Sequence, residues 1–359
     1  MKRILLSLSM AVLIAPLLVA APDTAGKGFT FSWFKSTSLY PESLAQPLSA
    51  VSNLNILSLL DGQPRSIRYA GQDSKEYKDY PIYDSDDKYA DETMYVQLKT
   101  GLNIGFLRCS YKGIIDGELS LHAALNSVFQ GFGGANNLGF DGVFFFGAQA
   151  RLFGMATVRV GLQHYSGHYG DETLQQLRSV EGDPIEYVRD NDLLFGLSVT
   201  PIPSLRLYAE ANLPMSNTWM HPAIHIPWWV IKRTSGEPLH SVEAGKENIS
   251  TTDFDSSYMA WIVSTGGEFS VPIASMGSAF LAADLTLHQD GQTKHTADGY
   301  DPSNPWEMEY TITLGIELLD QETGGGGRLQ FIYHDGRFPL LNFFYQRTRY
   351  IAFGFSFSL

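Results

Sequence analysis

Residues 306–318, WEMEYTITLGIEL, decide the fold class of this chain. Apolar side chains occupy every second position of the stretch, and glutamate, threonine and glycine fill the positions between them. Because alternate residues of a strand point to opposite faces, this pattern predicts a strand with one apolar and one polar face. Its 13 residues exceed the usual strand length of about five or six and suit a tilted membrane crossing.

The same alternation recurs along the chain. It predicts strands at residues 94–106, 118–125, 140–152, 156–166, 193–199, 205–213, 259–269, 279–287, 306–318, 329–333 and 351–359. From residue 153 onward the connections alternate between short and long, as do the periplasmic turns and outer loops of outer-membrane barrels. By this rule residues 94–106 run from the outside inward, so one more strand must precede them. Residues 28–34 show the better alternation, and residues 51–60 are the other candidate.

These patterns predict an all-β fold, a closed antiparallel transmembrane β-barrel of about 12 strands. A hairpin within residues 214–256 would make about 14. Charged and amide side chains line one face of nearly every strand, as a water-filled lumen requires. The apolar face ends in phenylalanine, tyrosine and tryptophan, as expected at a membrane interface. A large soluble all-β protein, with its polar faces in bulk water, is the alternative.

The first 21 residues have the layout of a secretory signal peptide. A basic start precedes an apolar run to Leu18, and small residues follow at Ala20 and Ala21. We therefore predict residues 1–21 to be a signal peptide that directs export.

Residues 22–359 are then predicted to form one barrel domain, in which residues 22–60 supply the first strand or a periplasmic or plug segment. Without Lys2 and Arg3, 23 of the 25 basic side chains remain against 38 acidic ones, a net charge of −15. This surplus argues against nucleic acid as a partner. Cys109 is the single cysteine, so the chain has no internal disulfide.

A cluster of titratable and hydroxyl side chains follows the predicted strand at residues 156–166. Its members are His164, Ser166, His168, Asp171 and Glu172, punctuated by Gly167 and Gly170. His164 and Ser166 continue the parity of the apolar side chains of that strand. We therefore expect both to face lipid near the outer rim of the barrel.

This cluster resembles the centre of the bacterial domain-of-unknown-function 1207 family, which reads H-x-S-S-H-L-G-D-E. Gly167 and Tyr169 depart from the pattern, and the matching residues are His164, Ser166, His168, Gly170, Asp171 and Glu172. The resemblance continues through residues 186–198, 279–291 and 333–355. It implies an exported, outer-membrane protein with no established activity.

His164-Tyr165-Ser166 is also similar to the H-x-S pattern on the outer wall of outer-membrane phospholipase A and the lipid A deacylase. That resemblance implies His164 as the base and Ser166 as the nucleophile toward an ester of the outer leaflet. Asn191 fits by parity as the group that orients the imidazole, with Asp190 and Glu172 as alternatives. Gly167 stands where the phospholipase pattern has asparagine.

Two further polar groups give no metal site. Lys88 and Tyr89 break the calcium-loop spacing of the acidic cluster Asp84, Asp86, Asp87, Asp91 and Glu92. Pro222 lies between His221 and His225 and opposes the helix that would pair them on zinc. We therefore predict no metal and no cofactor.

Together these patterns predict a bacterial outer-membrane β-barrel that contacts outer-membrane lipid and meets the barrel assembly machinery through its C-terminal strand. The acidic lumen would favour cations or neutral polar solutes. The first hypothesis is therefore a pore for small polar solutes, a function that needs no enzyme activity. An outer-leaflet lipid esterase or acylhydrolase using His164, Ser166 and Asn191 is the second. A soluble exported β-protein that binds an unidentified ligand is the third.

Overall fold

The computed structural model describes residues 28–70, 77–81, 91–112, 114–131, 136–173, 185–214, 230–233, 261–273, 277–289, 306–319, 326–343 and 346–358. The predicted signal peptide, residues 84–87 of the acidic cluster, and His221 and His225 lie outside the described residues.

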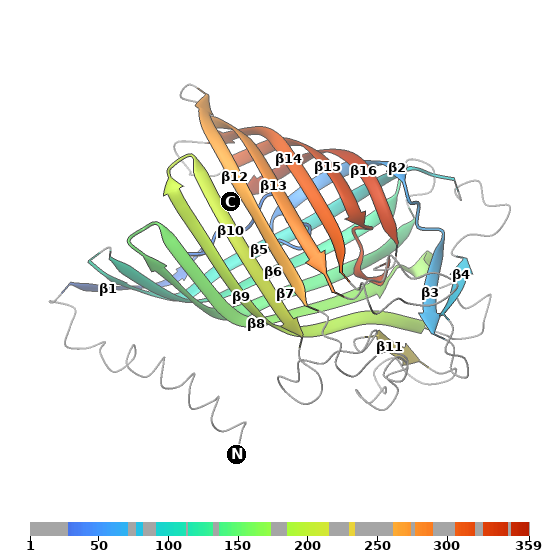
Figure 1. Cartoon of the computed structure of the whole chain (residues 1–359), viewed down its shortest axis with the longest axis horizontal. Coiled ribbons are helices and arrows are strands. Elements are labelled where there is room, and N and C mark those ends of the chain that lie inside the picture. Colours follow the sequence, from blue (N-terminus) through green and yellow to red (C-terminus); the bar gives the residue numbers. More distant parts are fainter. Residues whose placement is uncertain are drawn as a thin grey trace, which may run out of the picture.

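Twelve strands close into an antiparallel β-barrel (Figure 1). Each strand pairs with its neighbours, and β2 completes the ring by pairing with both β16 and β5. The ring strands are β2 (Ser52–Asp61), β5 (Met94–Tyr111), β6 (Ile115–Gln130), β7 (Asn137–Leu152), β8 (Ala156–Tyr169), β9 (Ile185–Ile202), β10 (Leu205–Pro214), β12 (Ile262–Ile273), β13 (Gly277–His288), β14 (Glu307–Leu319), β15 (Gly326–Arg337) and β16 (Arg347–Ser358). The predicted fold and strand number are confirmed.

Four short strands lie off this ring: β1 (Phe29–Lys35), described below, and β3, β4 and β11. β3 (Ser66–Ala70) and β4 (Tyr77–Pro81) form a separate hairpin within the predicted first outer loop. β11 (Val230–Arg233) pairs with residues 185–188 of β9. Within the described residues, β11 is the only strand between residues 214 and 256, so the barrel has twelve strands and not fourteen.

Strands β1 (Phe29–Lys35) and β2 share one edge of β5. β2 pairs with residues 94–99 of β5, and β1 pairs with residues 105–111 further along the same edge. Closing the ring also requires pairing with β16, and in the described pairings only β2 does so. The preferred candidate for the first ring strand, residues 28–34, is therefore wrong, and residues 51–60 are correct. Alternation alone could not separate them, because both stretches are genuine strands.

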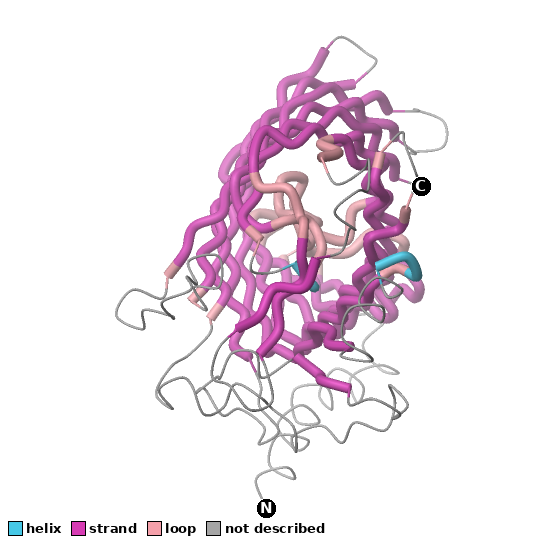
Figure 2. Tube along the Cα trace, turned by 90° about the vertical axis from the view of Figure 1, so that its right-hand side faces the viewer, coloured by secondary structure: helices cyan, strands magenta, loops and turns pink. Residues whose placement is uncertain are grey.

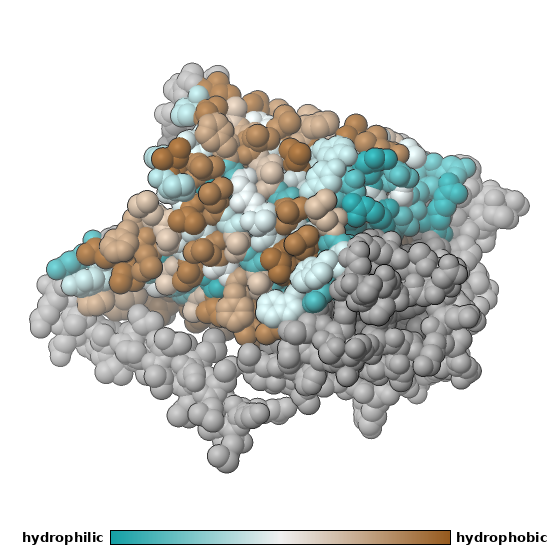
Figure 3. Space-filling view, in the orientation of Figure 1, coloured by the Kyte–Doolittle hydropathy of each residue, from teal (hydrophilic) through white to brown (hydrophobic). Residues whose placement is uncertain are grey.

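The outer face of the barrel is apolar. Its exposed large side chains follow one parity of each ring strand, among them Leu54 and Ile56 of β2, Leu281 of β13 and Leu314 of β14. Brown, hydrophobic side chains cover most of the wall in Figure 3, and the hydrophilic side chains gather toward the end that carries β3. A transmembrane barrel presents such an apolar band to lipid, whereas exposure of the band to water would be energetically unfavourable. Within the described part of the chain, no helix is long and apolar enough to cross a bilayer.

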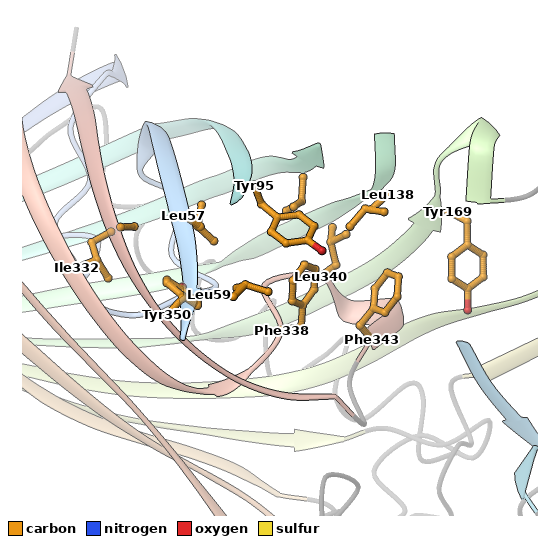
Figure 4. Close-up of a cluster of buried hydrophobic side chains, with 12 residues drawn as sticks. Leu57, Leu59, Tyr95, Leu138, Tyr169, Ile332, Phe338, Leu340, Phe343 and Tyr350 are labelled. Carbon is orange, nitrogen blue, oxygen red and sulfur yellow. The ribbon is translucent and has the colours of Figure 1, made fainter. Parts of the chain in front are cut away.

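An apolar core of buried side chains lies in the outer half of the lumen. Its centre is the outer segment, residues 338–343 between β15 and β16, which contributes Phe338, Leu340 and Phe343 (Figure 4). These side chains pack against buried inward-facing residues of the wall: Leu57, Leu59, Tyr95, Val128, Leu138, Tyr169, Ile332, Tyr350 and Ala352.

The other half of the lumen holds the inner segment, residues 36–51, which connects β1 to β2. Loop segments cross the inside of the ring in Figure 2. Wall side chains hold the inner segment by its backbone: the N–H of Leu39 donates to Glu118 at 3.1 Å, and Lys99 Nζ donates to the carbonyl of Pro47 at 2.6 Å. The polar strand faces alone indicated a water-filled lumen, but residues 36–51, within the range for which a plug was the alternative, lie inside it.

Candidate functional site

The predicted polar cluster lies on β8, and its side chains face outward. Along β8 the buried and partly exposed residues alternate, and His164, Ser166 and His168 share the parity of the exposed Val158, Val160 and Leu162. The intervening residues, such as Arg159 and Tyr165, point into the lumen and are buried. The structure thus places His164 and Ser166 on the outer face of the wall, as their parity predicted.

Asn191 on β9 meets His164 directly. The antiparallel register of β8 and β9 places the two residues opposite each other. His164 Nδ1 and Asn191 Oδ1 are 2.9 Å apart, a hydrogen bond in which Nδ1–H donates. In the neutral imidazole of this tautomer, Nε2 is the acceptor.

The strand register and the chain position argue against the two alternative partners. Asp190 pairs with the inward-facing Tyr165, one residue out of phase with His164, and its side chain lies outside the described residues. Glu172 follows the end of β8 and is exposed. The parity argument therefore selected the residue that the structure brings to the imidazole.

Ser166 lies between two aromatic pairs formed with β7. Phe144 is opposite His164, with ring centroids 6.2 Å apart, and Phe140 stacks on His168 at 4.6 Å. Opposite Ser166 stands Gly142, where a Cβ would lie 2.9 Å from Ser166 Oγ and 2.8 Å from the Phe144 ring. The glycine at position 142 therefore leaves space beside the Ser166 hydroxyl. The sequence analysis assigned no role in the site to Gly142, Phe140 or Phe144.

No hydrogen bond joins Ser166 to His164 among the described side chains. The two Cα atoms are two residues apart on one face of an extended strand, about 6.6 Å along it. Rotation of the serine about χ1 moves Oγ along the strand, so the pair can close without a change in the backbone. Hydrogen bonds of this kind are often open before substrate binds.

The site lies at the border of two surfaces. On the inner side of His164 the outward residues are apolar, with Leu162 and Phe146 each 42% exposed. On the other side, beyond His168, Asp171 and Glu172 are both exposed. Such a border corresponds to the level at which acyl chains join polar head groups.

A second set of polar groups, in the lumen, was not predicted from the sequence. Glu42 of the inner segment accepts a hydrogen bond from His122 Nδ1 and lies 3.7 Å from Arg159, which also pairs with Glu210. Burial alone raises the pKa of Glu42, but the charge and hydrogen bond of His122 and the charge of Arg159 outweigh it and lower the pKa to about 2. Glu42 is therefore an ionised anchor inside the barrel.

His122 also connects Glu42 to a serine. Ser38 Oγ lies 2.9 Å from His122 Nε2, so Ser38, His122 and Glu42 have the order of a hydrolase triad. The Gln149 amide also meets Nε2 at 2.8 Å, and its carbonyl accepts from Ser38 at 2.8 Å. Gln149 contacts both Ser38 Oγ and His122 Nε2. We therefore interpret the Ser38–His122–Glu42 series as an attachment of the inner segment. Parity pointed His122 and Arg159 inward, but nothing in the sequence paired them with Glu42.

The described residues contain no group of three or more histidine, cysteine, aspartate or glutamate side chains placed to hold a metal ion. The remaining residues of the acidic cluster, Asp91 and Glu92, lie at the rim, where Arg65 pairs with Asp91 at 2.7 Å.

The ring closure and the apolar belt define the class of protein: a transmembrane β-barrel of the outer-membrane type. No family model matches the chain, so the resemblance to the domain-of-unknown-function 1207 family stays a prediction, and no curated protein matches either.

Among solved structures, the chain is similar to the Salmonella typhi outer-membrane phospholipase dimer with bound calcium, at 10% identity over 85% of this chain and 90% of that one (TM-score 0.44). Outer-membrane phospholipase A from Escherichia coli is 11% identical over 85% and 89% (TM-score 0.44). The NanC porin is 10% identical over 86% and 100% (TM-score 0.35).

Proposed function

We propose that this protein hydrolyses acyl esters of lipids in the outer leaflet of the bacterial outer membrane, with the site on the outer wall at His164, Ser166 and Asn191. The observation that carries the proposal is the 2.9 Å hydrogen bond between His164 Nδ1 and Asn191 Oδ1 beside an outward-facing serine. This contact supports the tautomer with the proton on Nδ1, which the reaction below requires.

The reaction follows the serine hydrolase scheme. Ser166 Oγ attacks the acyl carbonyl carbon while His164 Nε2 takes the hydroxyl proton, and Asn191 holds the imidazole in position. His164 then returns the proton to the leaving alcohol, which leaves Ser166 acylated. Water, activated by the same Nε2, attacks the acyl carbonyl, releases the fatty acid and restores the serine.

The test is release of fatty acid from phospholipid or lipopolysaccharide in mixed micelles by the purified barrel. We expect Ser166→Ala to lower the rate to that of a preparation without the protein. Ser127→Ala is the matched control, because Ser127 on β6 also faces outward but has Leu125 and Phe129 instead of a histidine two residues away on the same face. Fatty acid release that persists unchanged in Ser166→Ala, or is absent from the wild type, would remove the proposal.

Passage of small polar solutes is the second candidate, favoured by the charged inward faces of the ring strands. Buried lumenal charges include Lys99 of β5, Glu118 of β6 and Glu210 of β10. Passage through this lumen requires the inner and outer segments to leave it. Ion steps in a planar bilayer would support this candidate, and a folded barrel without them would oppose it.

A further inference from the structure

We propose that the inner segment (residues 36–51) and the outer segment (residues 338–343) are two separate seals of one lumen, and that the barrel conducts no ions while either is in place. This goes beyond the proposed hydrolysis, which uses only the outer wall.

The inner segment is attached to much of the ring. Besides the backbone contacts of Leu39 and Pro47, Arg206 of β10 donates to the carbonyl of Pro41 at 2.6 Å and to that of Glu42 at 3.2 Å. The N–H of Leu44 donates to Glu268 of β12 at 2.8 Å. These wall groups come from strands on opposite sides of the ring, so the segment crosses the lumen and does not follow one wall.

A pocket lies between the inner segment and the wall. Its lining includes Glu42 and Gln46 of the segment and Arg159, Tyr165 and Glu210 of the wall. Charged and polar groups of the segment and of the wall therefore face each other across this pocket.

The outer segment has its own attachments. Asp141 accepts a hydrogen bond from the N–H of Leu341 at 3.1 Å, and Asn126 donates to the carbonyl of Pro339 at 2.8 Å. Its apolar side chains fill the outer half of the lumen. The hydrogen bonds that hold the two segments use different wall side chains, so loss of one set leaves the other intact.

The two seals meet in the middle of the lumen. Leu48 of the inner segment and Leu341 of the outer segment both pack on one small apolar cluster formed by Ala50, Ala124, Val143 and Tyr165. Ala124 on β6 is 4% exposed and lies at this junction. Labelling of a cysteine at position 124 therefore detects the loss of either seal, whereas ion conductance requires the loss of both.

The experiment replaces residues 37–50, residues 338–343, or both, with glycine-serine linkers of equal length, in a chain that carries Cys109→Ser and Ala124→Cys. Heat-modifiable gel mobility checks the fold. Each chain is treated with a charged, membrane-impermeant methanethiosulfonate and tested for conductance in a planar bilayer.

With both seals in place we expect no labelling and no conductance. Either single replacement should make Ala124→Cys react at least 10-fold faster while the bilayer stays silent, and the double replacement should give steady ion conductance.

Steady conductance with both seals or with one seal in place would overturn the proposal, as would a folded but silent double replacement. If the double replacement does not fold, the single ones still decide. An Ala124→Cys thiol that stays unreactive after either segment is replaced would also refute it.

Discussion

At the scale of the residue, the His164–Asn191 pair is the contact most open to test. In the proposed hydrolysis Asn191 contacts His164 and acts through the imidazole that it orients. As a positioning residue of that reaction, its removal should change the rate of the chemical step while lipid binding is retained.

We therefore expect Asn191→Ala to lower kcat for fatty acid release by about 100-fold with little change in KM. Asn191→Asp should recover much of that loss, because a carboxylate oxygen can also accept from Nδ1–H. Kinetics in mixed micelles with varied lipid fraction separate the two constants. A rise in KM at constant kcat would show that Asn191 binds lipid and does not position the base.

Glu42 gives a residue prediction with a defined sign. Its pKa in the folded protein, about 2, lies below the ordinary value of 4.5. Such a group stabilises the folded state at pH values above 4.5, and that contribution disappears as the pH falls toward 2. The groups that face it are His122 of β6 and Arg159 of β8, with Lys99 of β5 nearby.

Glu42→Gln should consequently be less stable than the wild type at pH 6, and the difference in unfolding free energy should shrink below pH 4.5 and vanish near pH 2. Denaturant unfolding in detergent at a series of pH values measures it. Glu172→Gln, at an exposed position after β8, serves as the control and should give no such difference. A difference that stays constant with pH would mean that the carboxylate is not the anchor.

At the scale of the element, the inner segment depends on Arg206 more than on any surface charge. The guanidinium is buried, donates to the carbonyls of Pro41 and Glu42, and also pairs with Glu268 at 3.1 Å. Arg151 offers a matched comparison, because it pairs with Asp116 at 2.6 Å at a more exposed place and does not bind the segment.

Arg206→Ala should lower the unfolding free energy by about 3–5 kcal/mol, because a buried partner charge and two carbonyls lose their donor. Arg151→Ala should cost only about 0–1 kcal/mol, as for other solvent-screened pairs. Thermal unfolding in detergent, read from gel mobility, compares the two. Equal losses would show that Arg206 is no more than a wall ion pair.

The elements also separate what the sequence could predict from what it could not. Parity follows from the local period of two, so it placed His164 and Ser166 outward and selected Asn191. The inner segment, SLYPESLAQPLSA at residues 38–50, has no such period. Its partners, such as His122 and Glu268, are distant in the chain, and no local pattern records those contacts. The sequence therefore left open whether residues 22–60 plug the lumen, and only the structure places residues 36–51 inside it.

At the scale of the whole molecule, the apolar belt opposes the soluble alternative. The exposed leucines and phenylalanines of the wall form a continuous band, which in water would drive aggregation. In a bilayer the same band is the stabilising surface, and the cost of a charge depends on its depth. Leu281 is 49% exposed near the middle of β13, and Leu60 is 53% exposed at the outer end of β2.

Leu281→Arg should therefore destabilise the barrel in phospholipid bilayers by about 2–4 kcal/mol, whereas Leu60→Arg should cost about 0–1 kcal/mol. Both substitutions add the same charge at a lipid-facing position, and only the depth differs. Denaturant unfolding and refolding in liposomes measures the two free energies. A soluble β-protein would tolerate arginine equally at both exposed sites. Equal and small costs would therefore contradict the transmembrane orientation itself. A larger cost at Leu60 would mean that the bilayer centre lies nearer Leu60 than Leu281.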